Sequence, residues 1–320
     1  MRYFTEDEVR RLLPMEAAID CLEPALAALA AGEAQNQPRR RLFLPTGAVL
    51  HSMAGAHGGY FGTKVYASHP RYGAHFTFLL YDASTATPLA QFEADHLGRI
   101  RTGAATGLAA RLLSRRDASR VGLIGTGFQA SGQLEAILKV RPVQSVRIWS
   151  RSEQRRQEFA REHSCPGVTL ETSGSAEEAV SGADIIITAT SAKDPVLQAE
   201  WVTSTAFVAA VGSNHPQRRE LPADLVRNAT VVVDSKEQAQ IEAGDLRLAF
   251  SDAGDWDSVI ELGAIITSIG IPITTGPQKQ RADREDRPLA SKPVVFKSVG
   301  LGLEDLAAAA WIYEQTTPAG

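Results

Sequence analysis

The feature that most constrains the fold is a glycine motif, Gly-x-Gly-x-x-Ala, at residues 125–130. The stretch "VGLIGTGFQASG" opens with an apolar run, Val121–Ile124, and continues into a helical pattern over about 130–140. Glycines at these positions let the backbone approach a pyrophosphate, and the helix N-terminus then favours the anion. A second apolar run, Val146–Trp149, follows the helix. This context predicts a dinucleotide-binding strand–helix–strand unit, the alternative being a tight turn without a ligand.

The expected cofactor-binding residues are those of the motif and of the segment that follows the second strand. They are Gly125, Thr126, Gly127, Phe128, Gln129, Ala130, Ser150, Arg151 and Ser152. In NAD enzymes the second strand usually ends in an acid that binds the ribose 2′-hydroxyl. Here Ser150 and Arg151 can instead bind a 2′-phosphate, although Arg151 can also be read as a solvated residue at a helix start. We therefore expect NADPH as the preferred cofactor with NADH possible, and chemistry in the direction of reduction.

The pattern along the chain predicts an α/β protein with two parts. From Val121 onward strands and helices alternate, which predicts a Rossmann-type doubly wound parallel sheet. Between Arg41 and Leu89, short aromatic and β-branched segments predict antiparallel strands. A capping box at Thr5 and Glu8 predicts an early helix.

These patterns predict a smaller α+β substrate and dimerisation domain beside the Rossmann domain. We expect the smaller domain to span residues 1–116 and to be completed by 294–320, with the Rossmann domain at 117–293. The segment Pro277–Pro288 reads as a mobile polar loop.

Composition excludes several classes of function. The 33 basic and 37 acidic residues give a net charge of −4, so neither a nucleic-acid partner nor a membrane surface is expected. Cys21 and Cys165 belong to no metal or redox motif, and the N-terminus lacks the apolar core of a secretory signal. We therefore expect a cytoplasmic protein. The seven histidines show no spacing typical of a metal site, and no metal is expected.

Seven segments, in order, resemble the ornithine cyclodeaminase/mu-crystallin family over nearly the whole chain. They are "RRRLFLP", "GTKVYASHP", "RIRTGAATGLAARLLSR", "GLIGTGFQA", "ADIIITATSAKDPVL", "AAVGSNHPQRREL" and "KSVGLGLEDLAAAA". The resemblance implies a homodimer that acts on a small amino or imino acid. Members include ornithine cyclodeaminases, alanine dehydrogenases and cyclic ketimine reductases, and mu-crystallin itself also binds thyroid hormone.

The resemblance also implies the residues of the substrate site. Arg40, Lys64 and Arg101 match positions that bind a substrate carboxylate, with Arg39 and Arg41 as alternatives to Arg40. A cationic clamp of this kind would orient a carboxylate against the nicotinamide. Arg101 can also be read as a brace between domains. The remaining matched residues are Thr190, Val211 and Gly212, which should line the cofactor cleft, and Ser298, Val299 and Gly300, which should border the nicotinamide or substrate. Asp234, an acid at a strand end, reads as structural.

Two departures from the family pattern favour one branch of it. Asn214 stands where cyclodeaminases and alanine dehydrogenases carry an Asp, and an amide cannot accept a proton near neutral pH. His51 stands where cyclodeaminases carry a Glu for the distal amine of ornithine. Both changes favour an enzyme that receives a preformed imine.

We therefore predict an NAD(P)H-dependent reductase of cyclic imino acids. It would convert Δ1-pyrroline-2-carboxylate to L-proline, Δ1-piperideine-2-carboxylate to L-pipecolate, or both. Lys64, or water held by Asn214 or His51, would supply the proton, in a positively lined cleft with no carboxylate near the reacting carbon. The alternatives are an NAD-dependent ornithine cyclodeaminase, an alanine dehydrogenase and a non-catalytic ligand-binding protein like mu-crystallin.

Overall fold

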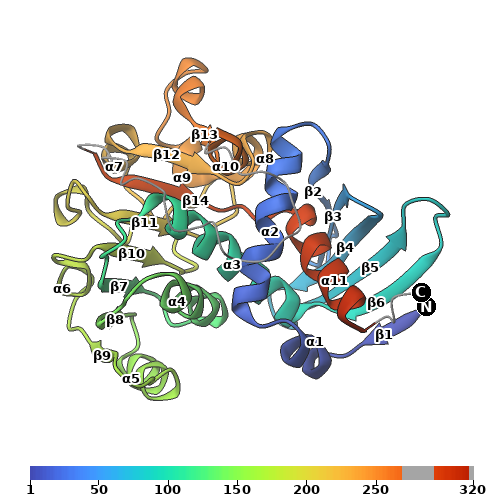
Figure 1. Cartoon of the computed structure of the whole chain (residues 1–320). Coiled ribbons are helices and arrows are strands. Elements are labelled where there is room, and N and C mark those ends of the chain that lie inside the picture. The colour runs from blue at the N-terminus through green and yellow to red at the C-terminus, as the bar shows by residue number, and fades with distance from the viewer. Residues whose placement is uncertain (269–291, 317–320) are drawn as a thin grey trace.

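The computed structural model describes residues 1–268 and 292–316 and contains two sheets with helices between them (Figure 1). The predicted loop at Pro277–Pro288 lies outside the described residues. One sheet has eight strands in the order β13-β12-β14-β11-β10-β7-β8-β9, and the other has six in the order β1-β6-β5-β4-β3-β2. This architecture confirms the predicted α/β fold with a doubly wound sheet and a second, smaller sheet.

Every pairing in the eight-stranded sheet is parallel. Its strands are β7 (Arg120–Ile124), β8 (Ser145–Trp149), β9 (Thr169–Thr172), β10 (Ile185–Thr188), β11 (Phe207–Ala210), β12 (Thr230–Val233), β13 (Ile260–Glu261) and β14 (Val294–Lys297). The central strands β10, β11 and β14 are buried at every residue, as expected where helices cover both faces of a parallel sheet. The carboxyl ends of these strands therefore meet at one edge, where ligands bind in such sheets.

The helices of the parallel layer connect its strands. They are α4 (Phe128–Val140), α5 (Glu153–Glu162), α6 (Ala176–Val180), α7 (Ala223–Asn228), α8 (Lys236–Glu242), α9 (Gly244–Arg247) and α10 (Leu262–Ser268), with short 3₁₀ turns η1 (Ala199–Trp201) and η2 (Gly254–Ser258). No helix among the described residues is long and apolar enough to cross a membrane.

The six-stranded sheet is antiparallel except where β1 (Arg2–Phe4) pairs with β6 (Pro88–Glu93). Its other strands are β2 (Gln35–Phe43), β3 (Val49–His57), β4 (Tyr60–His69) and β5 (Gly73–Asp82). The strands β1, β9 and β13 were not predicted, because they are short and largely exposed and so lack the apolar run that marks the four-residue central strands.

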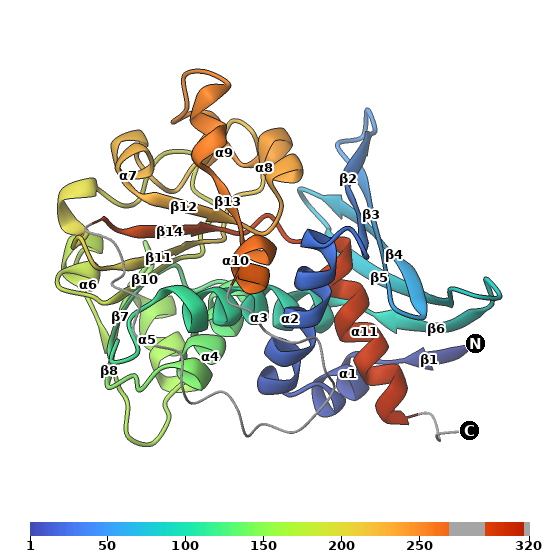
Figure 2. The same ribbon diagram turned by 45° about the horizontal axis from the view of Figure 1, so that its top comes forward.

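Four helices lie between and beside the two sheets (Figure 2). They are α1 (Glu6–Leu12), α2 (Met15–Ala30), α3 (Asp95–Leu113) and α11 (Gly302–Thr316). The predicted capping box is present, with Thr5 and Glu8 bonded reciprocally at the start of α1. α11 packs directly on the smaller sheet: a Cβ on Gly55 of β3 would lie 2.7 Å from the Cα atom of Leu303, so only glycine permits this approach. The face of the sheet that carries Gly55 is called the inner face below.

The last part of the chain crosses from one sheet to the other later than predicted. β14 lies between β11 and β12 in the parallel sheet, so residues 294–297 belong to that layer. Only after Lys297 does the chain reach α11 on the smaller sheet. The predicted boundary at residue 294 is therefore corrected to the turn that follows β14.

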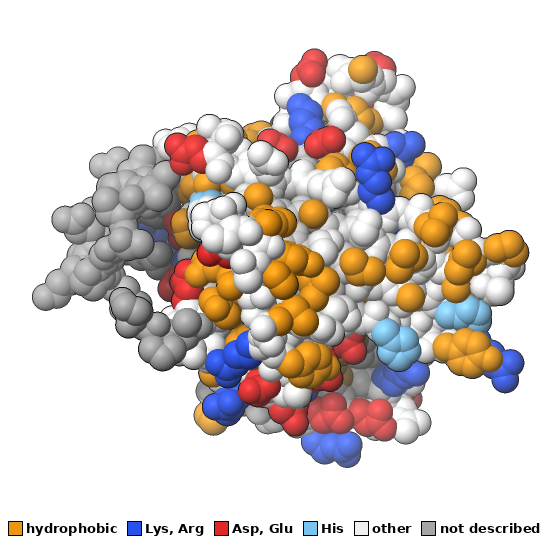
Figure 3. Space-filling model, turned by 90° about the vertical axis from the view of Figure 1, so that its right-hand side faces the viewer, with side chains coloured by type: hydrophobic (Ala, Val, Ile, Leu, Met, Phe, Trp, Pro, Cys, Tyr) orange, Lys and Arg blue, Asp and Glu red, His pale blue; other side chains and the backbone are white. Residues whose placement is uncertain are grey.

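The outer face of the smaller sheet carries exposed hydrophobic side chains. Figure 3 shows this side of the molecule, with large hydrophobic areas in orange. Leu42 of β2 and Leu50 of β3, which lie opposite each other in register, are 60% and 41% exposed there. An apolar area of this kind is typical of a surface that another chain covers.

Candidate active site

The glycine motif forms an open helix N-terminus at the edge of the parallel sheet. Gly125 has a φ of +111°, and a Cβ there would lie 2.3 Å from the carbonyl oxygen of Ala189. Gly127 is the N-cap of α4, and apart from its own chain neighbours no described atom lies within 4 Å of the position of a Cβ on it. The backbone of residues 125–130 is thus arranged as a pyrophosphate requires, and these residues fit a dinucleotide.

At the end of β8, a chain of hydroxyl groups leads away from the glycine motif. Thr126 donates to Oγ of Ser150 at 3.1 Å, and Ser150 donates to the carbonyl oxygen of Ser152 at 3.2 Å. Arg151 is exposed. The guanidinium of Arg156, one turn into α5, donates to the carbonyl oxygen of Ser150. The sequence analysis did not single out Arg156, because only the turn of α5 returns it to the strand end.

A buried carboxylate, Glu220, connects the ends of β10 and β11. It accepts hydrogen bonds from the backbone N–H and hydroxyl of Thr190, both at 2.7 Å, and from the N–H of Gly212 at 2.7 Å. A Cβ on Gly212 would lie 2.2 Å from the carbonyl oxygen of Thr190, so the two strand ends touch. The predicted cofactor residues Thr190, Val211 and Gly212 therefore lie together.

Behind Glu220 lies a buried ion pair. Asp245 accepts from the N–H groups of Glu220 and Leu221 at 2.6 and 2.9 Å and pairs with Nζ of Lys297 at 3.1 Å. Lys297 also donates to the carbonyl oxygen of Ser213 at 2.6 Å. The sequence analysis missed this network. Its one signal was a lysine in the apolar strand "VVFK".

The smaller sheet contributes a buried cation that faces α3 and α11. Nζ of Lys64 lies 2.9 Å from Oδ1 of Asp305, and Nε of Arg101 lies 3.2 Å from the same oxygen. Arg101 also pairs with Glu304 at 2.9 Å. Burial lowers the pKa of Lys64 to about 8, against the opposing effect of Asp305. The structure thus brings the predicted residues Lys64 and Arg101 together with Glu304 and Asp305 in one buried group, called the Lys64 cluster below.

The structure does not bring Arg40 to this cluster. Arg40 is exposed on the opposite face of β2, whereas Arg39 and Arg41 point inward and both pair with Glu242 of α8. The register of β2 against β3 shifts between Gln37 and Arg40, and this irregularity decides which arginines face inward. The choice of Arg40 over its neighbours is therefore corrected in favour of Arg39 and Arg41. A count of residues along the strand could not reveal the shift.

The turn after β14 meets the loop after β11 at Asn214. Asn214 donates from Nδ2 to the carbonyl oxygen of Val299 at 3.1 Å, and Arg41 donates to the carbonyl oxygen of Asn214 at 3.1 Å. Asp234 holds the turn, because its Oδ2 accepts from Ser298 Oγ at 2.9 Å and from the N–H groups of Val299 and Gly300 at 2.8 Å. The structural interpretation of Asp234 is confirmed.

His51 lies on β3 opposite Arg41. Its Nε2 atom is 2.9 Å from Oγ of Ser68, and its ring stacks on Tyr66. Burial and the nearby guanidinium groups lower the pKa of His51 to about 4. The imidazole is therefore neutral at physiological pH.

The expectation of a positively lined cleft without carboxylates is wrong. Glu242, Glu304 and Asp305 are buried and pair with the basic residues of the cluster. Several buried polar atoms here have no hydrogen-bond partner among the described residues: Nε of Arg39, Nδ1 of His51, Oδ1 of Asn214, Oε1 of Glu304 and Oδ2 of Asp305. Such atoms are rare in proteins, and their concentration here is typical of a site that a ligand completes.

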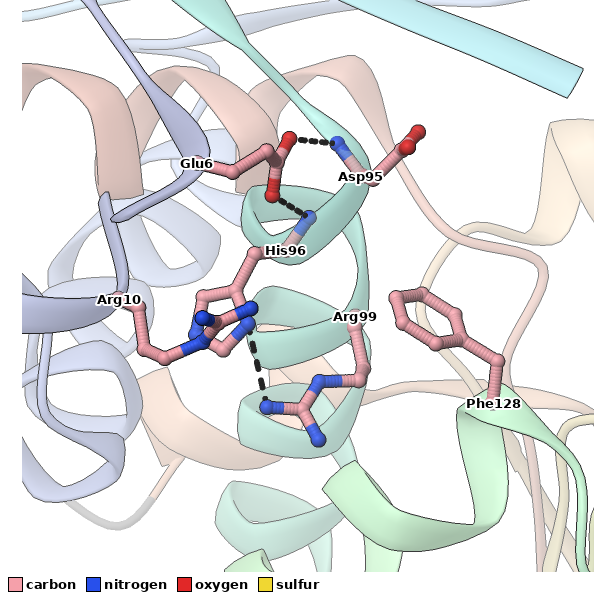
Figure 4. Close-up of a pocket in the computed structure, with 6 residues that line it drawn as sticks. All are labelled: Glu6, Arg10, Asp95, His96, Arg99 and Phe128. Atoms are coloured by element: carbon pink, nitrogen blue, oxygen red, sulfur yellow. Dashed lines mark hydrogen bonds between the residues drawn. The ribbon is translucent and has the colours of Figure 1, made fainter. Parts of the chain in front are cut away.

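A cavity of about 410 Å³ opens beside the glycine motif, between α1, α3 and α4 (Figure 4). Its lining includes Phe128 of the motif, with His96 and Arg99 of α3, which contact each other at 3.1 Å. Glu6 accepts from the N–H groups of Asp95 and His96 and so caps α3. Arg99 and Arg101 are two residues apart on a helix and point to different sides. The cavity is thus distinct from the Lys64 cluster.

A Rossmann-type sheet with an open helix N-terminus, beside a buried lysine and arginine, defines a nicotinamide-dependent oxidoreductase. Within that class, the chain belongs to the ornithine cyclodeaminase/mu-crystallin family, whose sequence profile matches residues 3–319.

Two relatives illustrate the range of the family. The chain is 32% identical to an alanine dehydrogenase of Archaeoglobus fulgidus over 316 residues, covering 97% of this chain and 93% of that protein. It is 37% identical to a Δ1-pyrroline-2-carboxylate reductase of Bacillus cereus over 248 residues, covering 76% of this chain and 71% of that protein.

Two solved structures share the fold over nearly the whole chain. The Δ1-pyrroline-2-carboxylate reductase of Thermococcus litoralis, in complex with NADH and L-proline, has a TM-score of 0.86 and 29% identity, covering 98% of this chain and 97% of that one. An archaeal alanine dehydrogenase dimer with bound NAD has a TM-score of 0.84 and 28% identity, covering 98% and 95%.

Proposed function

We propose that this protein is an NAD(P)H-dependent reductase of cyclic imino acids. The substrates would be Δ1-pyrroline-2-carboxylate, reduced to L-proline, and Δ1-piperideine-2-carboxylate, reduced to L-pipecolate. The observation that carries the proposal is the position of Lys64 in a cluster of charged side chains next to a dinucleotide-binding fold. Lys64 is a buried ammonium that pairs with Asp305, and its pKa is lowered to about 8. The similarity to two Δ1-pyrroline-2-carboxylate reductases supports this assignment.

We assign the cofactor to the edge of the parallel sheet. The pyrophosphate would bind the backbone of residues 125–130, and the nicotinamide would approach Thr190, Val211 and Gly212. NADPH is the proposed preference, because Ser150 and Arg151 stand where NAD enzymes usually carry an acid. Arg156 donates to the carbonyl oxygen of Ser150, so a second guanidinium lies near the group that would bind a 2′-phosphate. The two solved relatives hold NADH and NAD, so this preference distinguishes our proposal from them.

The bound dinucleotide supplies the hydride, which adds to the imine carbon. The protein's own residues hold the substrate and supply the proton. Arg101 and Arg41 would bind the carboxylate at the imine carbon, Arg41 replacing Arg40 in this role. Lys64 would transfer a proton from Nζ to the imine nitrogen, so that C=N becomes CH–NH, and would regain a proton from solvent.

The other proton donors fit less well. His51 has a pKa of about 4 and carries no proton to give near neutral pH. Asn214 is an amide, which holds the turn at Val299 and can orient the imine or a water molecule. Arg101 and Lys64 hold the pKa of Asp305 below its usual value despite its burial, so this carboxylate is a poor base for the oxidation of a saturated amine.

The exposed hydrophobic face of the smaller sheet supports a homodimer. Leu42 and Leu50 would be buried by a second copy. A cytoplasmic location fits Cys21 and Cys165, which form no disulfide.

The test of the proposal is consumption of NADPH and NADH with defined substrates. The substrates are the five- and six-membered imines, pyruvate with ammonia, and ornithine as a control. Reduction of the cyclic imines supports the proposal. Oxidation of alanine with NAD, or ammonia release from ornithine, would assign the chain to another branch of the family.

A further inference from the structure

A row of four side chains crosses the inner face of the smaller sheet. Arg41 of β2 lies opposite His51 of β3 in the strand register, His51 lies opposite Tyr66 of β4, and Tyr66 lies opposite Phe76 of β5. Partners in register point to the same side of a sheet, and Lys64, two residues before Tyr66, shares that side. The row therefore lies next to the Lys64 cluster.

Three of the four side chains form a continuous stack of rings. The His51 and Tyr66 rings lie 4.1 Å apart with planes 4° from parallel, and the Tyr66 and Phe76 rings lie 4.6 Å apart at 23°. Because the rings face one another across the strands, the open side of the stack presents ring edges. Nζ of Lys64 lies 5.2 Å from the centre of the Phe76 ring.

The stack is not sealed beneath other elements. The neighbouring row on the same face, Met53, Lys64 and Phe78, is buried, whereas His51, Tyr66 and Phe76 are only partly buried. The accessible row thus begins where the buried row ends, so part of each ring in the stack is exposed to solvent beside Lys64.

The charges around the stack define what it can receive. The rings themselves are uncharged, and Arg41 at one end is already paired with Glu242. In the proposed orientation the substrate carboxylate lies towards Arg41 and the imine nitrogen towards Lys64, so the row offers the rest of the substrate neutral ring surface and no carboxylate. The rings of the stack instead offer apolar surface on which the methylenes of a small ring can be buried.

We propose that Tyr66 and Phe76 determine the specificity of this enzyme by receiving the ring of a cyclic imino acid. The inference rests on the proposed imine reduction and adds an order of preference: six-membered ring over five-membered ring over an acyclic imine. Each further methylene buried on the stack raises kcat/KM about fourfold.

The test compares three substrates in four proteins. The substrates are the six- and five-membered imines and the N-methyl imine of pyruvate, and the proteins are the wild type, Tyr66→Ala, Tyr66→Phe and Tyr81→Ala. Tyr81 is the matched control, because it forms an aromatic pair with Phe61 at 5.1 Å on the other face of the same sheet. The Kd for NADPH and the oligomeric state show whether each variant is folded.

We expect Tyr66→Ala to lower kcat/KM at least tenfold for the six-membered imine, mainly through KM, and less than threefold for the acyclic one. Tyr66→Phe and Tyr81→Ala should keep the wild-type order of preference. Equal losses of kcat/KM on all three substrates, or the same change of preference in Tyr81→Ala, would overturn the role of the stack and leave the proposed function standing. A wild type that binds NADPH and reduces none of the three would overturn the proposed function as well.

Discussion

Nζ of Lys64 and Oδ1 of Asp305 lie 2.9 Å apart in a fully buried pair that joins β4 to α11 across 241 residues of sequence. The same oxygen accepts from Arg101. The pair fixes the ammonium beside the proposed imine site. It also binds the last helix of the chain to the smaller sheet, so catalysis and stability depend on the same contact.

The substitution Asp305→Asn is expected to destabilise the protein strongly. It leaves two buried cations without their shared carboxylate, and loss of one partner of a buried pair costs about 3–5 kcal/mol. The free energy of unfolding in urea measures this cost. Asp117→Asn is the control, because Asp117 is 76% exposed in its pair with Arg115 and should change stability little. Similar small effects of both substitutions would contradict the buried pair.

The rate of imine reduction should depend on the protonation of Lys64. Its pKa is lowered to about 8, so the ammonium is present below that pH and lost as the pH rises through it. We expect kcat/KM to fall above about pH 8. The folded state binds the Lys64 proton less tightly than the unfolded state, so the contribution of Lys64 to the free energy of unfolding increases as the pH rises. The expected fall of kcat/KM above pH 8 is therefore not caused by unfolding through Lys64.

The control for this profile is Lys64→Arg, which keeps a charge but cannot donate a proton in this range. We expect kcat to fall about 100-fold or more, while L-proline still binds. A variant that keeps the wild-type rate and the wild-type pH profile would remove Lys64 from the proposed mechanism.

The two faces of β2 give a test of the substrate-binding arginines. Arg41 points to the inner face and Arg40 to the outer face. Arg41→Met should raise KM for the imine at least tenfold, because it removes a cation from the proposed carboxylate site. Arg40→Met should leave KM within about twofold. Steady-state kinetics of both variants measure these KM values. A raised KM in Arg40→Met together with an unchanged KM in Arg41→Met would restore Arg40 to the substrate site.

Arg151 tests the proposed cofactor preference. Arg151→Asp should lower kcat/KM for NADPH at least tenfold through repulsion of the 2′-phosphate, with less than a threefold effect for NADH. Arg155→Asp is the matched control, since Arg155 is exposed on the same helix start. Equal damage with both cofactors would show that Arg151 does not contact the phosphate.

The sequence was sufficient to predict features that depend on local spacing. The motif at Gly125–Ala130, the parallel strands and the capping box at Thr5 each rest on a few consecutive residues, and the structure confirms all three as structural elements. Lys64 also stood out, because a lysine in an apolar strand needs a partner.

The remaining features depend on contacts between distant segments. Nothing near Lys64 in the sequence points to Asp305, and nothing near Arg41 points to Glu242, because these pairs form only when the two sheets come together. Because the register shifts before Arg40, Arg39 and Arg41 face the inner side of the sheet and Arg40 faces the outer side, the reverse of what we expected. Glu220 is recognisable only once β10 and β11 lie side by side.

The central claim is that hydride reaches an imine carbon supplied from outside the enzyme. The most direct measurement uses NADPH deuterated at C4, with Δ1-pyrroline-2-carboxylate or Δ1-piperideine-2-carboxylate as substrate. We predict deuterium at C2 of proline or pipecolate, with one dinucleotide oxidised for each product molecule. Release of ammonia from ornithine with NAD⁺, together with no label in either product from the imines, would contradict the claim.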